Sequence, residues 1–176
     1  AANIVGVCTS GLTKTGGFGK IVQVVSTTKT DTFSESLAQG AISADAISLA
    51  ITPTSSSNKI LVRANCCFGC GSNGYQRMGG IFYKAGSVLT GAIADASGNI
   101  QRVSFTSNSH ASARGGNVGS EYLDTAGGTS SITYSVRLAH GYAGTATMYL
   151  NRMQSENDYN YSHRAISTLT LIEIEA

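Results

Sequence analysis

Residues 59–68, KILVRANCCF, restrict the possible folds more than any other stretch, because an apolar side chain recurs at every second position. Alternate side chains of an extended strand point to opposite faces, so this spacing turns one apolar face toward a core. One face comprises Ile60, Val62, Ala64, Cys66 and Phe68, and the other comprises Leu61, Arg63, Asn65 and Cys67. The stretch therefore predicts a long strand with one buried face.

Similar strand-like runs, separated by turn-forming clusters, continue along the chain at the spacing typical of a sandwich or barrel. Ala85-Gly86 is expected to form a hairpin turn, and the DASGN segment, residues 95–99, a second turn. Residues 34–46 could hold one helical turn, although Gly40 lies among them. The further predicted strands cover residues 21–26, 30–34, 47–52, 78–84, 88–93, 102–107, 122–124, 132–138, 147–151 and 165–174.

Composition supports an all-β chain. There are 21 Gly, one Pro and no Trp, and the abundant Ser and Thr favour strands and turns over long helices. The 176 residues suffice for one domain. Residues 20–176 are therefore predicted to form an antiparallel β-sandwich of about eight to ten strands, jelly-roll-like in size.

Residues 1–19 contain several glycines and little periodicity, so they are predicted to form an extended N-terminal arm or tether. The opening AANIVGVCTSG has neither the basic flank nor the long apolar centre of a secretory signal. Ile4, Val5 and Val7 are apolar but have no pattern with which to pack locally. They are the candidate residues for anchoring the arm to another protein.

Charged residues make up 12% of the chain, and the formal net charge is +2. A nucleic-acid partner is not expected, because the Arg residues are scattered and form no basic stripe. A membrane partner is not expected either, because the apolar stretches are too short to cross a bilayer. A charge-poor surface favours contacts between identical subunits, since few charges lose their hydration. We expect homo-oligomers, with contacts at Tyr134, Val136, Tyr149 or residues 165–174.

The cysteines predict no disulfide framework, because Cys66, Cys67 and Cys70 lie almost together and Cys8 is in the arm. Reduced thiols without a bound metal are expected. The alternative is a zinc site formed with His110, His140 or His163. It is disfavoured because neighbouring residues of a strand, such as Cys66 and Cys67, point to opposite faces.

No sequence motif predicts catalysis or a cofactor. The segment from Gly16 to Lys20 lacks the first glycine and the Ser or Thr of a phosphate-binding loop, and residues 95–99 lack the distal glutamate of a calcium loop. No nucleophile elbow is present. The acid pairs Asp31 with Glu35, Glu121 with Asp124, and Glu156 with Asp158 are expected to be solvated charges. The chain is therefore predicted not to be an enzyme.

The longest predicted polar loops cover residues 107–119 and 153–163, and loops commonly carry recognition. Near the second loop, aromatic and polar residues gather that can stack on a sugar or fill a protein interface. The alternative is a tyrosine-anchored loop that packs on its own sandwich. The candidate recognition residues are Tyr142, Asn157, Asp158, Tyr159, Tyr161 and His163.

Five segments of the chain carry a resemblance to known proteins: KIVQVVSTTKTDTFS (20–34), ISLAITPTSSSNKILVRANCC (47–67), ADASGN (94–99), SSITYSVRL (130–138) and STLTLIEI (167–174). Together they resemble a family of small virion surface proteins of tailed bacteriophages of aquatic bacteria and cyanobacteria. The resemblance covers residues 20–174 in order. The CC-x-x-C cluster and the short arm depart from the family pattern, in which the domain commonly ends a longer fibre-like chain.

The resemblance implies a β-sandwich knob that works as a homotrimer on the virion, after synthesis in the host cytoplasm. It implies no catalytic residue and no cofactor. The short arm favours a capsid decoration or cement subunit, or a compact spike, over a long fibre. Of these, we expect a decoration subunit bound to the major capsid protein or another virion protein. The alternative is a tail-fibre or spike knob that recognises a host surface receptor, a glycan or a protein.

Overall fold

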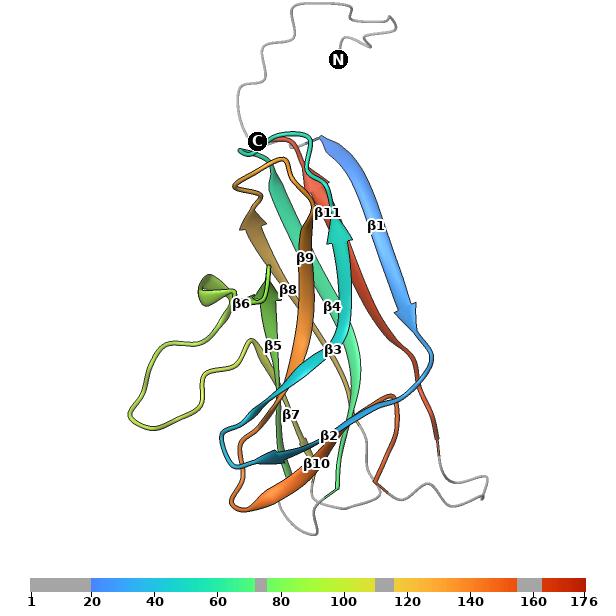
Figure 1. The fold of residues 1–176 in the computed structure, drawn as a ribbon, viewed down its shortest axis with the longest axis vertical. Coiled ribbons are helices and arrows are strands. Elements are labelled where there is room, and N and C mark those ends of the chain that lie inside the picture. Colours follow the sequence, from blue (N-terminus) through green and yellow to red (C-terminus); the bar gives the residue numbers. More distant parts are fainter. Residues whose placement is uncertain (1–19, 72–75, 110–115, 155–162) are drawn as a thin grey trace, which may run out of the picture.

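Two antiparallel sheets pack face to face in the computed structural model, which describes residues 20–71, 76–109, 116–154 and 163–176 (Figure 1). Their inner faces share one continuous apolar core. This arrangement confirms the predicted all-β antiparallel sandwich. The jelly-roll order of connections stays a prediction.

The first sheet is built around β4 (Lys59–Cys70). One edge of β4 pairs with β8 (Gly116–Thr125). Along its other edge it pairs first with β11 (Ser167–Ile174) and then with β10 (Thr145–Leu150). Two outer strands extend the sheet on this side: β1 (Ile21–Lys29) pairs with β11, and β2 (Phe33–Ala38) pairs with β10.

The second sheet has β9 (Ile132–His140) between β3 (Ile42–Ile51) and β5 (Gln76–Lys84). The free edge of β5 pairs with β7 (Phe105–Ser109) and, further along, with the two-residue β6 (Ser87–Val88). The predicted hairpin turn between β5 and β6 is confirmed: Ala85 and Gly86 have φ values of 49° and 79°. Consecutive positive φ values match the twist of a tight hairpin.

The core confirms the buried face predicted for β4. Ile60, Val62 and Cys66 are fully buried, whereas Arg63 and Asn65 are exposed. Aromatic rings join the two sheets where Phe68 of β4 stacks on Phe105 of β7, with ring centroids 5.5 Å apart. Burial of such side chains supplies most of the driving force for folding.

The chain itself covers the outer face of the second sheet. The short 3-10 helix η1 (Thr90–Ala92) first packs against the core between the sheets, where Leu89 is buried, and the chain then passes over part of this outer face between Ile93 and Val103. Ile93 and Val103 of this segment pack on Ile81 of β5 and on its neighbours Tyr83 and Ala139. Gly79 allows the close approach, because an added Cβ would lie 2.5 Å from a Val103 methyl group.

Three local predictions are wrong. Residues 34–46 form no helical turn: they belong to β2 and β3, joined by a turn in which Gly40 has φ 76°. Residues 88–93 are not a strand, because the chain turns into η1, where Gly91 leaves room for the Tyr122 hydroxyl. Residues 107–109 and 116–119 are not loop, since β7 and β8 extend through them. Pairing with β5 and β4 outweighs the low strand propensity of Gly, Asn and Ser.

Asn151 forms a buried polar junction where β10 ends and β11 takes over its place beside β4. Its Nδ2 donates to the carbonyl oxygens of Lys29 at 2.8 Å and Asp31 at 2.9 Å. Its Oδ1 accepts from the Ser167 hydroxyl at 2.6 Å, and its backbone N–H donates to Cys67 O. One side chain thus joins the bend between β1 and β2 to the start of β11.

Glu173 forms a second junction near the end of β11, where its side chain points inward and is fully buried. Its carboxylate accepts hydrogen bonds from Gln23 Nε2 at 2.6 Å, Asn58 Nδ2 at 2.6 Å, and the Thr54 backbone and hydroxyl at 2.7 and 2.8 Å. Burial alone would raise the pKa of Glu173, but the hydrogen bonds from Gln23, Asn58 and Thr54 outweigh it and lower the pKa to about 2. The carboxylate ties the connection between β3 and β4 to the first sheet.

Candidate functional site

The candidate anchoring and recognition segments leave the sandwich at opposite ends. Lys20 lies beside the C-terminal end of the chain, because its carbonyl oxygen accepts a hydrogen bond from Glu175 N at 2.9 Å (Figure 1). The turn between β9 and β10 and the residues on either side of segment 155–162 lie toward the other end. The anchoring candidates Ile4, Val5 and Val7 lie outside the described residues.

The predicted recognition group is described only in part. Tyr142 lies half-buried in the turn between β9 and β10, and His163 is exposed before β11. The other members of the predicted group lie outside the described residues: Asn157, Asp158, Tyr159 and Tyr161. The structure therefore does not test whether the six residues form one site.

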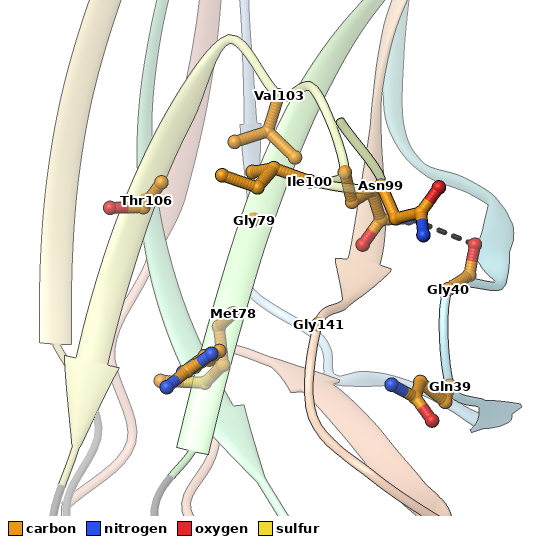
Figure 2. Close-up of a pocket in the computed structure, with 11 residues that line it drawn as sticks. Gln39, Gly40, Met78, Gly79, Asn99, Ile100, Val103, Thr106 and Gly141 are labelled. Atoms are coloured by element: carbon orange, nitrogen blue, oxygen red, sulfur yellow. Dashed lines mark hydrogen bonds between the residues drawn. The ribbon is translucent and has the colours of Figure 1, made fainter. Parts of the chain in front are cut away.

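A pocket of about 600 Å³ that the sequence did not predict opens beside the start of β5 (Figure 2). Its walls come from the β2–β3 turn, β5, β7 and residues 99–103. Gln101 Nε2 donates to Gly40 O at 2.9 Å and joins two of these walls. The lining residues include Gln39, Gly40, Arg77, Gly79, Asn99, Ile100 and Thr106.

Arg77 is the one charged residue among the described residues that line this pocket. Its backbone carbonyl oxygen accepts from Gly141 N at 3.0 Å, but its guanidinium group makes no hydrogen bond or ion pair with another described residue, and Gln39 and Asn99 add amide groups to the lining. Free guanidinium and amide donors suit a polar ligand such as a sugar or a carboxylate. Sequence reasoning missed the pocket because its residues come from five separate segments.

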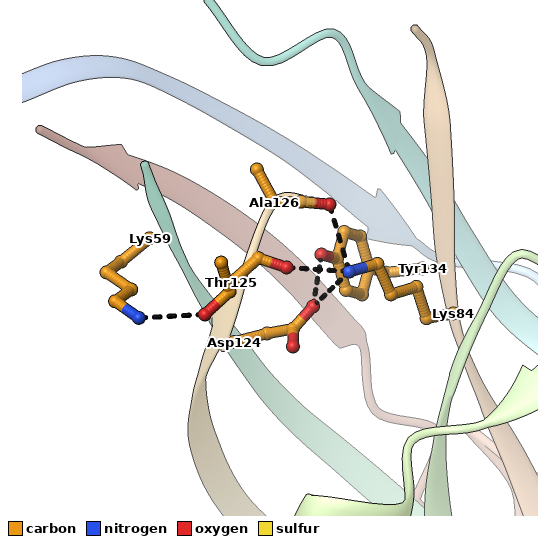
Figure 3. Close-up of polar contacts among 6 residues, drawn as sticks. All are labelled: Lys59, Lys84, Asp124, Thr125, Ala126 and Tyr134. Atoms are coloured by element: carbon orange, nitrogen blue, oxygen red, sulfur yellow. Dashed lines mark hydrogen bonds and ion pairs between the residues drawn. The ribbon is translucent and has the colours of Figure 1, made fainter. Parts of the chain in front are cut away.

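Lys84, Asp124 and Tyr134 form the densest group of ionisable side chains in the described sandwich (Figure 3). Lys84 Nζ donates to Asp124 Oδ2 at 2.7 Å and to the carbonyl oxygens of Thr125 and Ala126 at 2.7 and 3.1 Å. Tyr134 OH donates to the same Asp124 oxygen at 2.8 Å. Burial, followed by the hydrogen bond to Asp124, raises the pKa of Tyr134.

This group is structural, because all three N–H donors of Lys84 are occupied by acceptors of the protein itself. It holds β8 of the first sheet to β5 and β9 of the second. The prediction that Asp124 is a solvated charge is wrong, since 14% of its side chain is exposed. Glu121, on the outer face of β8, does face solvent and lies 3.7 Å from Arg63.

Cys66 and Cys67 point to opposite faces of β4, as predicted: Cys66 is buried in the core and Cys67 is half-buried on the outer face. Burial raises the pKa of the Cys66 thiol to about 12. Within the described residues no three His, Cys, Asp or Glu side chains gather as a metal site would require. His140 lies buried at the end of β9, and its Nδ1 has no hydrogen-bond partner there.

In the folded protein, Cys66 and Cys70 are expected to resist a thiol reagent, while Cys67 reacts first. Both protected thiols lie in the core, and the reactive thiolate form of Cys66 is suppressed by its raised pKa. Tandem mass spectrometry of the labelled peptide resolves the three positions, and labelling in denaturant is the control. Equal rates at Cys66 and Cys67 in the folded protein would contradict the expected burial.

Two of the expected subunit contacts are wrong. Tyr134 and Val136 are both 0% exposed in the core, so neither side chain can reach a partner subunit. Tyr149 of β10 is half-buried, with the Arg152 guanidinium over its ring. In β11, the core takes Leu169 and Leu171, and the alternate residues face outward. Of the contacts expected from the sequence, Tyr149 and the outward face of β11 remain available.

Comparison with known proteins finds no family model that matches this chain and no curated protein that matches it. In the described part of the chain, no helix has the length and apolar character needed to cross a membrane.

Proposed function

We propose that this chain is a structural protein of the virion surface of a tailed bacteriophage, a decoration subunit that its N-terminal arm anchors to the capsid. The observation that carries the proposal is the separation of Lys20 from the loop end of the sandwich (Figure 1). A subunit held through the residues before Lys20 presents its far end away from the particle. The arm would bind the major capsid protein or another virion protein.

The use of ionisable groups supports a non-enzymatic role. The side chains of Lys84, Asp124 and Glu173 form hydrogen bonds that join strands and connections of the sandwich to one another. Each of these groups is satisfied by the protein itself, which leaves none of the three poised for proton transfer or attack. A sandwich whose strands are joined by such buried hydrogen bonds suits a protein that must stay folded on the outside of a particle.

The alternative function is a tail-fibre or spike knob that recognises a host surface glycan or protein. The pocket beside β5 favours it, because the side chains of Arg77, Gln39 and Asn99 line it and have no hydrogen-bond partner among the residues that the structure describes. The predicted homotrimer suits either function, since decoration subunits and knobs both gain avidity from several copies.

Imaging of purified virions with an antibody against this protein tests the proposal. Label spread over the heads is expected for a decoration subunit. Label confined to tail or vertex tips would instead establish the alternative, and unlabelled virions would refute both.

The arm is tested by adding purified full-length protein to virions that lack it. The triple variant Ile4→Asp, Val5→Asp and Val7→Asp is expected to lose binding at least about tenfold, because charged residues cannot occupy an apolar contact without losing hydration. Ile166→Asp, at an exposed position of the sandwich, is the control and is expected to bind normally. Unchanged binding of the triple variant would show that the arm is not the anchor.

A further inference from the structure

The outer face of the first sheet carries an apolar row that no described part of the chain covers. Val24 of β1 pairs with Ile172 of β11, Ile172 pairs with Leu61 of β4, and Leu61 pairs with Leu123 of β8. All four side chains point outward, because their strand neighbours Val25, Leu171, Ile60, Val62 and Tyr122 pack into the core. Val24 is 53% exposed and Leu123 49% exposed.

The rest of this face is mostly small and polar, with Lys59 between Ile174 and Thr125 on one side of the apolar row. The next row pairs Ser26, Thr170, Arg63 and Glu121, and the row after it pairs Thr28, Thr168, Asn65 and Gly119. Arg63 and Glu121 offset each other, with Nε 3.7 Å from the carboxylate. A shallow hollow of about 710 Å³ lies beside the apolar row, where Gly119 and two threonines leave space.

The two outer faces of the sandwich differ in this respect. Val88, Ile93 and Val103 cover Ile81, Tyr83 and Ala139 on the second sheet, whereas on the first sheet Val24 and Leu123 are exposed and Leu61 and Ile172 are half-buried between them. An apolar row in register across four strands is a contiguous patch rather than scattered exposed residues, and such patches mark contact surfaces.

We propose that this face, centred on Val24, Leu61, Leu123 and Ile172, is the contact surface for a second copy of this chain. A second copy presents the same charge-poor face, so two copies meet without repulsion or loss of hydration at many charges. A different protein that is attracted by charge would be expected to meet residues of one charge sign around this face. Arg63 and Glu121 carry opposite charges that offset each other, so they do not provide such a rim.

The area of the face is sufficient for association. Four strands about 4.8 Å apart, with about eight residues of about 3.3 Å each, cover roughly 500 Å². Two such faces together bury about 1,000 Å², the lower limit for a specific protein interface. The inference rests on the proposed assembly of the chain into homo-oligomers and assigns a surface to it. Because the same face meets itself, the contact has two-fold symmetry and predicts a dimer in place of the trimer that the resemblance implies.

Sedimentation velocity of the full-length protein over a range of concentrations tests the inference. The wild type is expected to self-associate, and Val24→Lys and Leu123→Lys are each expected to weaken association at least about tenfold, because each places an ammonium group in the contact. Ile100→Lys and Ile166→Lys are matched controls, since these residues are 71% and 56% exposed outside the face. Thermal unfolding checks that all four variants fold.

Association of the Val24→Lys and Leu123→Lys variants that equals the wild type would overturn the inference and move the contact elsewhere. A wild type that stays monomeric at all concentrations would also overturn the inference. It would indicate that another protein, or the arm of this chain, covers the apolar face. Failure of the proposed function is distinguishable: weakened association of the two variants combined with absence of the protein from virions would sustain the contact surface and refute the virion role.

Discussion

Replacing Asn151 with Ala is expected to destabilise the protein by about 3 kcal/mol, because one buried side chain connects three parts of the first sheet. The substitution leaves the carbonyl oxygens of Lys29 and Asp31 and the Ser167 hydroxyl without their partner in a site from which solvent is excluded. It also places Ala at φ 66°, a left-handed conformation that Asn tolerates better than Ala.

Two further variants separate these contributions. Asn151→Gly removes the side chain without the backbone strain and is expected to be about 1 kcal/mol less destabilised than Asn151→Ala. Asn151→Asp keeps the shape and the acceptor for Ser167 but loses both donors to the carbonyl oxygens. Equilibrium unfolding in urea measures all three. An Ala variant within about 0.5 kcal/mol of the wild type would show that the junction is not a main source of stability.

The strands with strict alternation could be predicted from sequence. Buried and outward side chains alternate along β4 from Lys59 to Phe68 and along all of β11, and one buried face accounts for each pattern. β8 was largely missed because Gly119 and Ser120 interrupt any apolar alternation, and its position is set by ten residue pairs with β4. Pairing of this kind joins residues far apart in the chain, which a local pattern does not contain.

The surfaces could not be predicted for the same reason. The apolar row exists only because the strand register places Val24, Ile172, Leu61 and Leu123 side by side. Alternation shows that Tyr134 and Val136 share a face, but not whether that face is inside or outside, and the sequence-based choice of the outside was wrong. The pocket beside β5 likewise needs the fold of residues 89–104 over the second sheet.

Glu173 is a further case, since its sequence context, LIEIEA, suggests an edge charge rather than a buried one. Alternation along β11 forces it inward, and the partners that make burial tolerable come from Gln23, Thr54 and Asn58. A buried carboxylate that accepts several hydrogen bonds is held ionised without a paired cation. Its protonation state should therefore control part of the stability of the fold.

The stability of the wild type is expected to fall as the pH is lowered from about 5 to about 2, by about 2 kcal/mol from Glu173. The hydrogen bonds outweigh burial and lower the folded pKa from 4.5 to about 2. The ionised group thus stabilises the fold fully above the unfolded pKa, and this contribution is lost as the pH falls through the folded pKa. Urea unfolding at several pH values measures the change.

Glu173→Gln removes the titrating group while nearly keeping its shape, so its stability should depend less on pH. At neutral pH the variant is expected to be about 2 kcal/mol less stable than the wild type, because its neutral oxygen accepts more weakly from Thr54 and Asn58 than a carboxylate does and its amide nitrogen faces the donor of Gln23. Toward pH 2 the two stabilities should converge, since the wild-type carboxyl is then increasingly protonated. Glu121→Gln is the matched control, because the side chain of Glu121 is 60% exposed and its ion pair with Arg63 is long. Its free energy of unfolding is expected to differ from that of the wild type by less than about 0.5 kcal/mol. Parallel curves for the wild type and Glu173→Gln from pH 6 to pH 2 would show that the buried carboxylate does not carry the acid sensitivity of the fold.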